Sequence, residues 1–201
     1  MTDIIRLRDN NRPGKTEKRD TIRLKDREQL LKKRDRRVVL VMDGSDSMDD
    51  SKKRFATKGA IAFAQSALAK SYSVGVVGFA SNARLICKPT TDVERIDKAC
   101  GCWPVSGGTF IGAGLSAAQN LSLDPEDVIV VVTDGACSQP NDSLSIASKL
   151  KAKGIEILAI GTDDADQHFL QQLASRPDLG LKVELSRLTS AITDASRLLK
   201  S

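Results

Sequence analysis

The stretch Val38-Val-Leu-Val-Met-Asp-Gly-Ser-Asp-Ser-Met48 decides the fold of this 201-residue chain. Its first five residues are apolar, and polar turn residues follow them directly. A short apolar run with such a boundary is typical of a buried parallel strand. Ligand sites in open α/β sheets lie at the carboxyl ends of such strands. We therefore expect Asp43, Ser45 and Ser47 to lie at a ligand-binding edge of a sheet.

From Val38 onward, apolar runs alternate with helix-like segments, which indicates an α/β fold with a mostly parallel sheet. The expected strands are residues 38–42, 73–79, 84–87, 128–133, 155–160 and 180–185. The expected helices are residues 51–70, 92–99, 112–121, 143–153, 166–175 and 188–199. A tight turn at Ser81-Asn82 predicts that the third strand pairs antiparallel with the second.

Oxygen-bearing side chains occur at two further points of this pattern. Thr109 follows two glycines just before an expected helix, and Asp134 follows the apolar run 128–133. One carboxylate and two hydroxyls on alternate residues, as in Asp43-x-Ser45-x-Ser47, can turn toward one point. These groups are hard oxygen ligands, which suit Mg²⁺ or Mn²⁺. The sequence therefore predicts a divalent-cation site without histidine or cysteine ligands.

In this order along the chain, the motifs resemble the metal-ion-dependent adhesion site of von Willebrand factor type A domains, over roughly residues 37–195. The resemblance implies a Rossmann-like three-layer α/β/α fold with six strands in the order 3-2-1-4-5-6. Only the third strand, at the edge, would be antiparallel. The implied metal site consists of Asp43, Ser45, Ser47, Thr109 and Asp134. The two serines would bind the metal directly, the threonine directly or through water, and the two aspartates through water.

The resemblance also implies a function. The domain is expected to be a protein–protein interaction module, not an enzyme, in which Mg²⁺ or Mn²⁺ attracts an Asp or Glu of a partner. Small intracellular relatives often act as adaptors for AAA-type ATPases or occur in stress-response systems, so we expect a cytoplasmic protein with such a partner. Fold alone does not determine function, and this expectation is an analogy.

The first motif departs from the common pattern of that family. Asp46 stands between the two serines, where glycine is usual, and Gly44 follows Asp43. We expect Gly44 to supply the unusual backbone angles that the missing glycine would have allowed. Asp46 and the nearby Asp49 and Asp50 should strengthen cation binding, but they should also repel an acidic partner.

The positive charge of the chain belongs to its beginning. Residues 1–37 have a net charge of +7 and the remainder −2, for a total of +5. We interpret residues 1–36 as a basic arm that contains a charged helix from Thr16 or Asp20 to about Arg36, and residues 37–201 as the domain. The alternative function is nucleic-acid binding through this arm, although its mixed charges and lack of aromatic residues argue against it.

Catalysis by a metal-dependent hydrolase is the second alternative, and the motifs do not favour it. No P-loop or dinucleotide fingerprint is present, and the single histidine, His168, lies far along the chain from Ser45 and Ser47.

The four cysteines are expected to be reduced thiols. No stretch has the length of a membrane span, and the chain start has no signal-peptide pattern. Trp103 is either part of the core or an exposed contact beside the metal.

Overall fold

The computed structural model describes residues 36–103 and 105–200. Six strands of this part form one sheet in the order β3-β2-β1-β4-β5-β6. They are β1 (Arg36–Asp43), β2 (Tyr72–Phe79), β3 (Ala83–Thr90), β4 (Val128–Thr133), β5 (Glu156–Gly161) and β6 (Gly180–Lys182). Only the β2–β3 pair is antiparallel. The predicted strand order and the predicted antiparallel edge strand are both confirmed.

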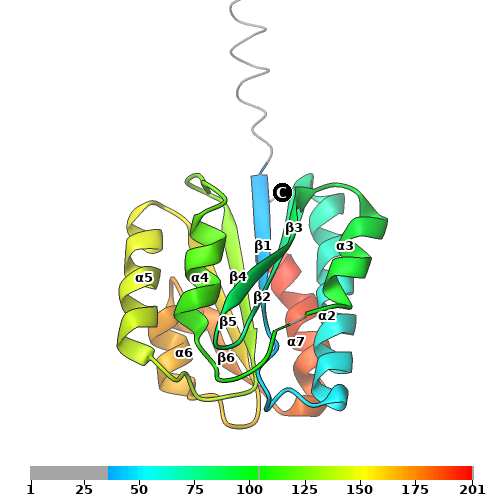
Figure 1. Ribbon diagram of the computed structural model, residues 1–201. Helices are drawn as coiled ribbons and strands as arrows, with labels where there is room; N and C mark the ends of the chain where they lie inside the picture. The colour runs from blue at the N-terminus through cyan, green and yellow to red at the C-terminus, as the bar shows by residue number, and fades with distance from the viewer. Residues whose placement is uncertain (1–35, 104, 201) are drawn as a thin grey trace, which may run out of the picture. The chain divides into compact units, whose positions relative to one another are not determined.

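Helices cover both faces of the sheet. They are α2 (Asp50–Ala69), α3 (Val93–Cys100), α4 (Ile111–Gln119), α5 (Pro140–Ala152), α6 (Gln167–Leu173) and α7 (Leu188–Ala195). Figure 1 shows α2, α3 and α7 on one side of the sheet and α4, α5 and α6 on the other. The domain is therefore a three-layer α/β/α structure, as predicted.

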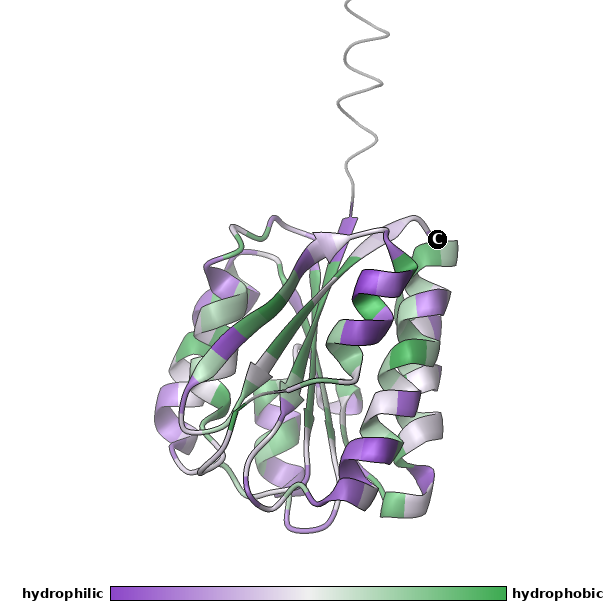
Figure 2. Ribbon diagram, turned by 45° about the vertical axis from the view of Figure 1, so that its right-hand side comes forward, coloured by the Kyte–Doolittle hydropathy of each residue, from purple (hydrophilic) through white to green (hydrophobic). Residues whose placement is uncertain are grey.

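The central strands are buried on both faces, which explains their continuous apolar sequences. Every residue of Val38–Met42 is wholly inaccessible to solvent, and β4 is buried along its length. Val38 pairs with Val74 of β2 on one side and with Val128 of β4 on the other. Figure 2 shows these hydrophobic strands running through the middle of the domain, between helices that carry both hydrophilic and hydrophobic residues. Because β1 is central, its carboxyl end lies in the middle of one sheet edge, the lower one in Figure 1.

The chain after β5 differs from the prediction in two places. The last strand was expected over 180–185, but β6 ends at Lys182 and a 3₁₀ turn covers Leu185–Arg187. The closing helix was expected over 188–199, but α7 ends at Ala195 and another 3₁₀ turn, Ser196–Leu198, follows. Ser196 explains the second difference, since its hydroxyl donates a hydrogen bond to the Thr193 carbonyl at 2.6 Å and competes with regular helix geometry.

The predicted N-terminal helix lies outside the described residues, so the arm–domain boundary and the nucleic-acid hypothesis stay predictions. Within the described part of the chain, none of the helices combines the length and the apolar character that crossing a membrane would require.

The four cysteines are free, and they differ sharply in burial. Cys87 on β3 and Cys100 at the end of α3 are buried, whereas Cys102 is exposed. Burial raises the pKa of the Cys87 thiol and raises that of Cys100 to about 12. In the unfolded chain this thiol ionises near its ordinary pKa of 9.0. The free energy of unfolding should therefore fall as the pH rises from 9.0 toward about 12, because only the unfolded state ionises Cys100 in that interval.

We expect a thiol reagent at pH 8 to modify Cys102 first and to reach Cys87 and Cys100 only after unfolding, since the thiolate is the reactive form. The measurement is the time course of labelling with a chromogenic disulfide, in native buffer and in denaturant. A Cys102→Ala protein should lose the fast phase. Rapid native labelling of Cys100 would contradict the described packing.

Candidate metal centre

The loop after β1 and the glycine loop before α4 are joined by a pair of hydrogen bonds through Asp46. The Asp46 amide donates to the Gly107 carbonyl at 3.0 Å, and the Gly107 amide donates to Asp46 Oδ1 at 2.9 Å. Gly107 adopts a φ of +103°, which glycine tolerates without strain. The aspartate that replaces the usual glycine therefore connects the two loops, and this carboxylate already has a partner within the chain.

Gly44 is required for space and not for unusual backbone angles, which corrects our expectation. Among the described residues, the glycines with a positive φ are Gly107 and Gly154, and Gly44 is not one of them. A Cβ atom on Gly44 would lie 2.5 Å from Val105 Cγ2 and 3.5 Å from Trp103 Cβ. Trp103 is 9% exposed and belongs to the core. The two possibilities left open for this residue are thus resolved in favour of a packing role beneath the loop.

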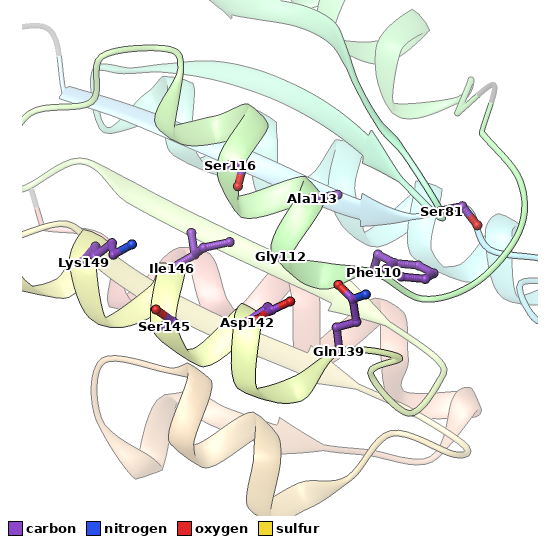
Figure 3. Close-up of a pocket in the computed structure, with 10 residues that line it drawn as sticks. All are labelled: Ser81, Phe110, Gly112, Ala113, Ser116, Gln139, Asp142, Ser145, Ile146 and Lys149. Atoms are coloured by element: carbon purple, nitrogen blue, oxygen red, sulfur yellow. The ribbon is translucent and has the colours of Figure 1, made fainter.

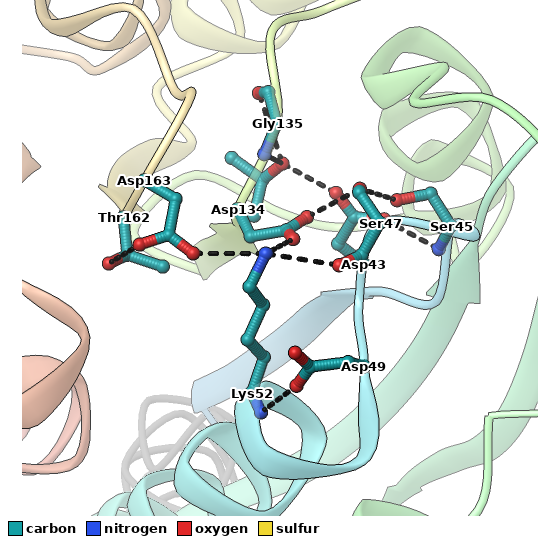
Figure 4. Close-up of polar contacts among 10 residues, drawn as sticks. Asp43, Ser45, Ser47, Asp49, Lys52, Asp134, Gly135, Thr162 and Asp163 are labelled. Carbon is teal, nitrogen blue, oxygen red and sulfur yellow. Dashed lines mark hydrogen bonds and ion pairs between the residues drawn. The ribbon is translucent and has the colours of Figure 1, made fainter.

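Hydroxyl and carboxylate groups from the ends of β1 and β4 form one continuous network, drawn in Figure 4. Ser45 Oγ and Ser47 Oγ lie 2.9 Å apart. Ser47 Oγ donates a hydrogen bond to Asp134 Oδ1 at 2.8 Å. The two strands are neighbours in the sheet, so residues 87 positions apart in sequence meet at the same edge. The parallel pairing of β1 and β4 thereby brings together side chains that are far apart in the sequence.

Asp43 lies behind this network and holds its loop in place. The carboxylate is wholly buried; Oδ1 accepts a hydrogen bond from the Ser45 amide at 2.8 Å, and Oδ2 accepts one from the Thr133 hydroxyl. Burial raises the pKa of Asp43, and the hydrogen bonds from Thr133 and Ser45 oppose that rise. Thr133 was not predicted as part of the site. Its position as the last residue of the apolar run, directly before Asp134, was the available signal.

Thr109 approaches the same point from the glycine loop. The backbone of Thr109 is bonded to Ser138. The Thr109 amide donates a hydrogen bond to Ser138 Oγ at 3.2 Å, and the Thr109 carbonyl accepts one from the Ser138 amide at 2.9 Å. A Cβ atom placed on Gly135 would lie 3.1 Å from Thr109 Oγ1 and 3.5 Å from Ser47 Oγ. The two hydroxyls therefore flank the same small space beside Gly135.

A cation of the chain itself reaches the site, and sequence analysis missed it. Lys52 Nζ contacts Asp134 Oδ2 at 2.7 Å and Asp163 Oδ2 at 2.9 Å. Hydrogen bonding to Asp134 raises the pKa of Lys52, so the ammonium group stays charged. Lys52 lies in the first turn of α2, and Asp163 follows the carboxyl end of β5. The polar residues Thr162-Asp163-Asp164, which follow a third parallel strand, were the signal for Asp163.

The donors present suit a hard divalent cation. All five predicted residues, Asp43, Ser45, Ser47, Thr109 and Asp134, lie at this edge and offer only hydroxyl and carboxylate oxygens. Among the described residues, no cluster of three or more His, Cys, Asp or Glu side chains is arranged to hold a metal. A site of mainly neutral hydroxyls with few carboxylates fits Mg²⁺ or Mn²⁺ better than a thiol- or imidazole-seeking metal. That these residues ligate a metal stays a prediction.

His168 is not part of this network. It is exposed on α6, and its Nε2 lies 3.0 Å from Nε2 of Gln172. The serine hydroxyls are bonded to each other and, at Ser47, to the Asp134 carboxylate, so the described contacts form no Ser-His pair.

A groove of about 470 Å³ opens between α4 and α5 and begins next to Thr109, at Phe110. Figure 3 shows Ala113 and Ser116 of α4 facing Asp142, Ile146 and Lys149 of α5 across it. Small α4 residues leave this space open, and both charged and apolar side chains line it. The groove provides a shaped surface beside the candidate metal site.

Fold and site together define a class: an α/β domain with a hydroxyl-rich oxygen site at the carboxyl edge of its central strands. Residues 38–197 match the family model of the von Willebrand factor type A domain. The chain belongs to this family.

Individual relatives match smaller parts. The chain is 31% identical to human (Homo sapiens) matrilin-3 over 119 residues, which are 52% of this chain and 24% of that protein. It is 35% identical to human matrilin-4 over 121 residues, which are 52% of this chain and 19% of that protein. The chain thus spans a quarter or less of the length of these relatives.

Solved structures share the fold at low sequence identity. The von Willebrand factor domain of the type V pili tip protein Mfa5 from Porphyromonas gingivalis has a TM-score of 0.72 at 13% identity, covering 82% of this chain and 96% of that chain. Proximal thread matrix protein 1 from the mussel byssus, with a zinc-occupied MIDAS motif, has a TM-score of 0.65 at 20% identity, covering 79% of this chain and 47% of that chain.

Proposed function

We propose that this domain is a metal-dependent protein-interaction module that binds an acidic side chain of a partner protein, and that it is not an enzyme. The observation that carries the proposal is the convergence of Ser45, Ser47 and Asp134 at one point, with Thr109 beside them. The metal is Mg²⁺ or Mn²⁺. When bound, it offers an electrophilic coordination position that a carboxylate can fill.

The chain's own residues prepare this site for recognition. Asp43 holds the Ser45 amide and the Thr133 hydroxyl, so the motif loop is fixed before any ligand arrives. Asp46 accepts a hydrogen bond from the Gly107 amide, which holds the motif loop against the glycine loop. The groove between α4 and α5 adjoins Thr109 and supplies contacts that distinguish one partner from another.

The proposed setting is a cytoplasmic complex, with an AAA-type ATPase or a stress-response assembly as the source of the partner. The cysteine spacing of the sequence, which includes no C-x-x-C motif, is compatible with a reducing compartment. Membership in the von Willebrand factor type A family supports an interaction module in general, and the matrilin relatives point to no particular partner.

The test is capture of partners from a native lysate by the full chain, in Mg²⁺ and in EDTA, read by mass spectrometry. We expect a partner that is retained in Mg²⁺ and lost both in EDTA and with Thr109→Ala. The reason is that Thr109 Oγ1 flanks the same space as Ser47 Oγ. Binding should fall by about tenfold or more on loss of one oxygen ligand.

Thr91→Ala is the matched control, because Thr91 is exposed in the loop between β3 and α3, away from the network. It should retain the partner in Mg²⁺. A captured protein is then purified and its acidic residues are replaced one at a time, and one of them should account for the metal-dependent part of binding. A set of partners indifferent to metal and to Thr109 would refute the proposal.

A further inference from the structure

Lys52 places a positive charge beside Asp134, a carboxylate of the candidate metal site. Its Nζ atom lies 2.7 Å from Asp134 Oδ2, 2.9 Å from Asp163 Oδ2 and 3.1 Å from the Ser47 carbonyl oxygen. Figure 4 shows the side chain extending from α2 to these groups. The ammonium group is thus held by three oxygens from the ends of β1, β4 and β5.

The contacts of Asp134 show why this matters. Its side chain is wholly buried; Oδ1 accepts a hydrogen bond from Ser47 Oγ, and Oδ2 contacts Lys52. The Asp134 carboxylate therefore contacts both Ser47, a predicted metal ligand, and the Lys52 ammonium group. A buried carboxylate without a counter-ion is costly, so Lys52 stabilises the protein when no metal is bound. The same positive charge repels a divalent cation held on the hydroxyl side.

We propose that Lys52 is an internal cation that competes with the metal: it pairs with Asp134 and Asp163 in the metal-free domain and thereby lowers the affinity of the site for divalent cations. The inference rests on the proposed function, because it concerns the same metal site. It adds that the site is built to fold and persist without metal and to take up the ion only when the ion is abundant. The residue sets the threshold for metal binding and does not act as a ligand.

The first test measures the affinity of the full chain for Mg²⁺ and for Mn²⁺ by titration calorimetry. Lys52→Met should bind both ions about tenfold or more tightly than the unaltered protein, since it removes a like charge next to the site. Lys58→Met is the matched control, because Lys58 is an exposed residue of the same helix and the substitution removes the same charge. It should leave the affinity unchanged.

Thermal unfolding gives a second, independent readout. In EDTA, Lys52→Met should unfold at a lower temperature than the unaltered protein, because Asp134 and Asp163 lose their counter-ion. Saturating Mg²⁺ should raise the unfolding temperature of Lys52→Met by more than that of the unaltered protein. Lys58→Met should behave like the unaltered protein in both buffers.

A third measurement does not depend on the folding of Lys52→Met. In the unaltered protein labelled with ¹⁵N-lysine, the Lys52 ammonium signal, identified by its absence in Lys52→Arg, should be visible in EDTA because its protons are held in hydrogen bonds. Saturating Mg²⁺ should abolish this signal, since a released ammonium group exchanges its protons with water. A signal that persists under saturation would overturn the proposal.

The outcomes separate this inference from the proposed function. If the unaltered protein binds Mg²⁺ and Lys52→Met binds it equally or more weakly, Lys52 does not compete with the metal, while the interaction module still stands. If Lys52→Met binds Mg²⁺ and the unaltered protein does not, the competition is supported in its strongest form. If none of the proteins binds either ion, both proposals fail.

Discussion

A Ser47→Ala protein is expected to lose about a hundredfold or more in affinity for Mg²⁺. Ser47 Oγ is the centre of the network: it lies 2.9 Å from Ser45 Oγ and donates to Asp134 Oδ1 at 2.8 Å. Removing it deletes one proposed ligand and also leaves Asp134 Oδ1 without the hydroxyl that orients it. Calorimetric titration with Mg²⁺ measures the loss, and partner capture in Mg²⁺ should fail with the same protein.

Ser148→Ala serves as the control, because Ser148 is an exposed serine on α5 and the substitution removes the same hydroxyl. Its Mg²⁺ affinity should match that of the unaltered protein. Ser47 is exposed, but its hydroxyl donates to the wholly buried Asp134 carboxylate. Ser47→Ala should therefore stay folded in EDTA and unfold at a slightly lower temperature than the unaltered protein. Unchanged Mg²⁺ binding by Ser47→Ala would place any metal at a different set of oxygens.

The largest effect on stability is expected at the opposite end of β1 and β4. Asp127 accepts hydrogen bonds from the Arg37 amide at 2.9 Å, from Arg37 Nε at 2.8 Å and from the Asp124 amide at 2.8 Å. Its side chain is 4% exposed. Asp127→Ala should lower the free energy of unfolding by about 3 kcal/mol, because it leaves two backbone amides and Arg37 Nε without their acceptor. It also removes the more buried of the two carboxylates that pair with Arg37, so that only Asp124 remains.

Denaturant unfolding followed by the fluorescence of Trp103, the single tryptophan, provides the measurement. Asp178→Ala is the matched control: it removes the same group from an ion pair with Arg176 in which both side chains are more than half exposed. That substitution should change stability by less than about 0.5 kcal/mol. Equal effects of the two substitutions would mean that Asp127 contributes no more than a surface pair.

Much of the fold followed from local sequence pattern. Val38–Met42 and Val128–Val132 are continuous apolar runs, and both lie in buried parallel strands, because a strand covered on both faces favours apolar residues along its length. The short last strand was harder to place. Gly180–Lys182 pairs only with β5 at the edge of the sheet, so few contacts determine where it ends. The strand order came from the family resemblance and not from the pattern itself.

The candidate site was predicted in part. Asp43, Ser45, Ser47 and Asp134 follow strands that turn out to be neighbours, which is why motif order along the chain was informative. The contact that Asp46 makes was not predicted. Its carboxylate was expected to add negative charge near the site, and the structure shows that it also accepts a hydrogen bond from the amide of Gly107, a residue 61 positions away. No local pattern shows which distant amide will be the partner of a carboxylate.

The sequence by itself determined the alternation of strands and helices and the placement of oxygen-bearing residues at strand ends, because burial and turn chemistry act on neighbouring residues. Only the tertiary structure decided which of those residues meet. It placed Trp103 beneath the motif loop and brought Lys52 from α2 to the carboxylates that follow β4 and β5. Such contacts depend on how packed elements orient long side chains across the sheet edge, and that orientation is a property of the whole fold.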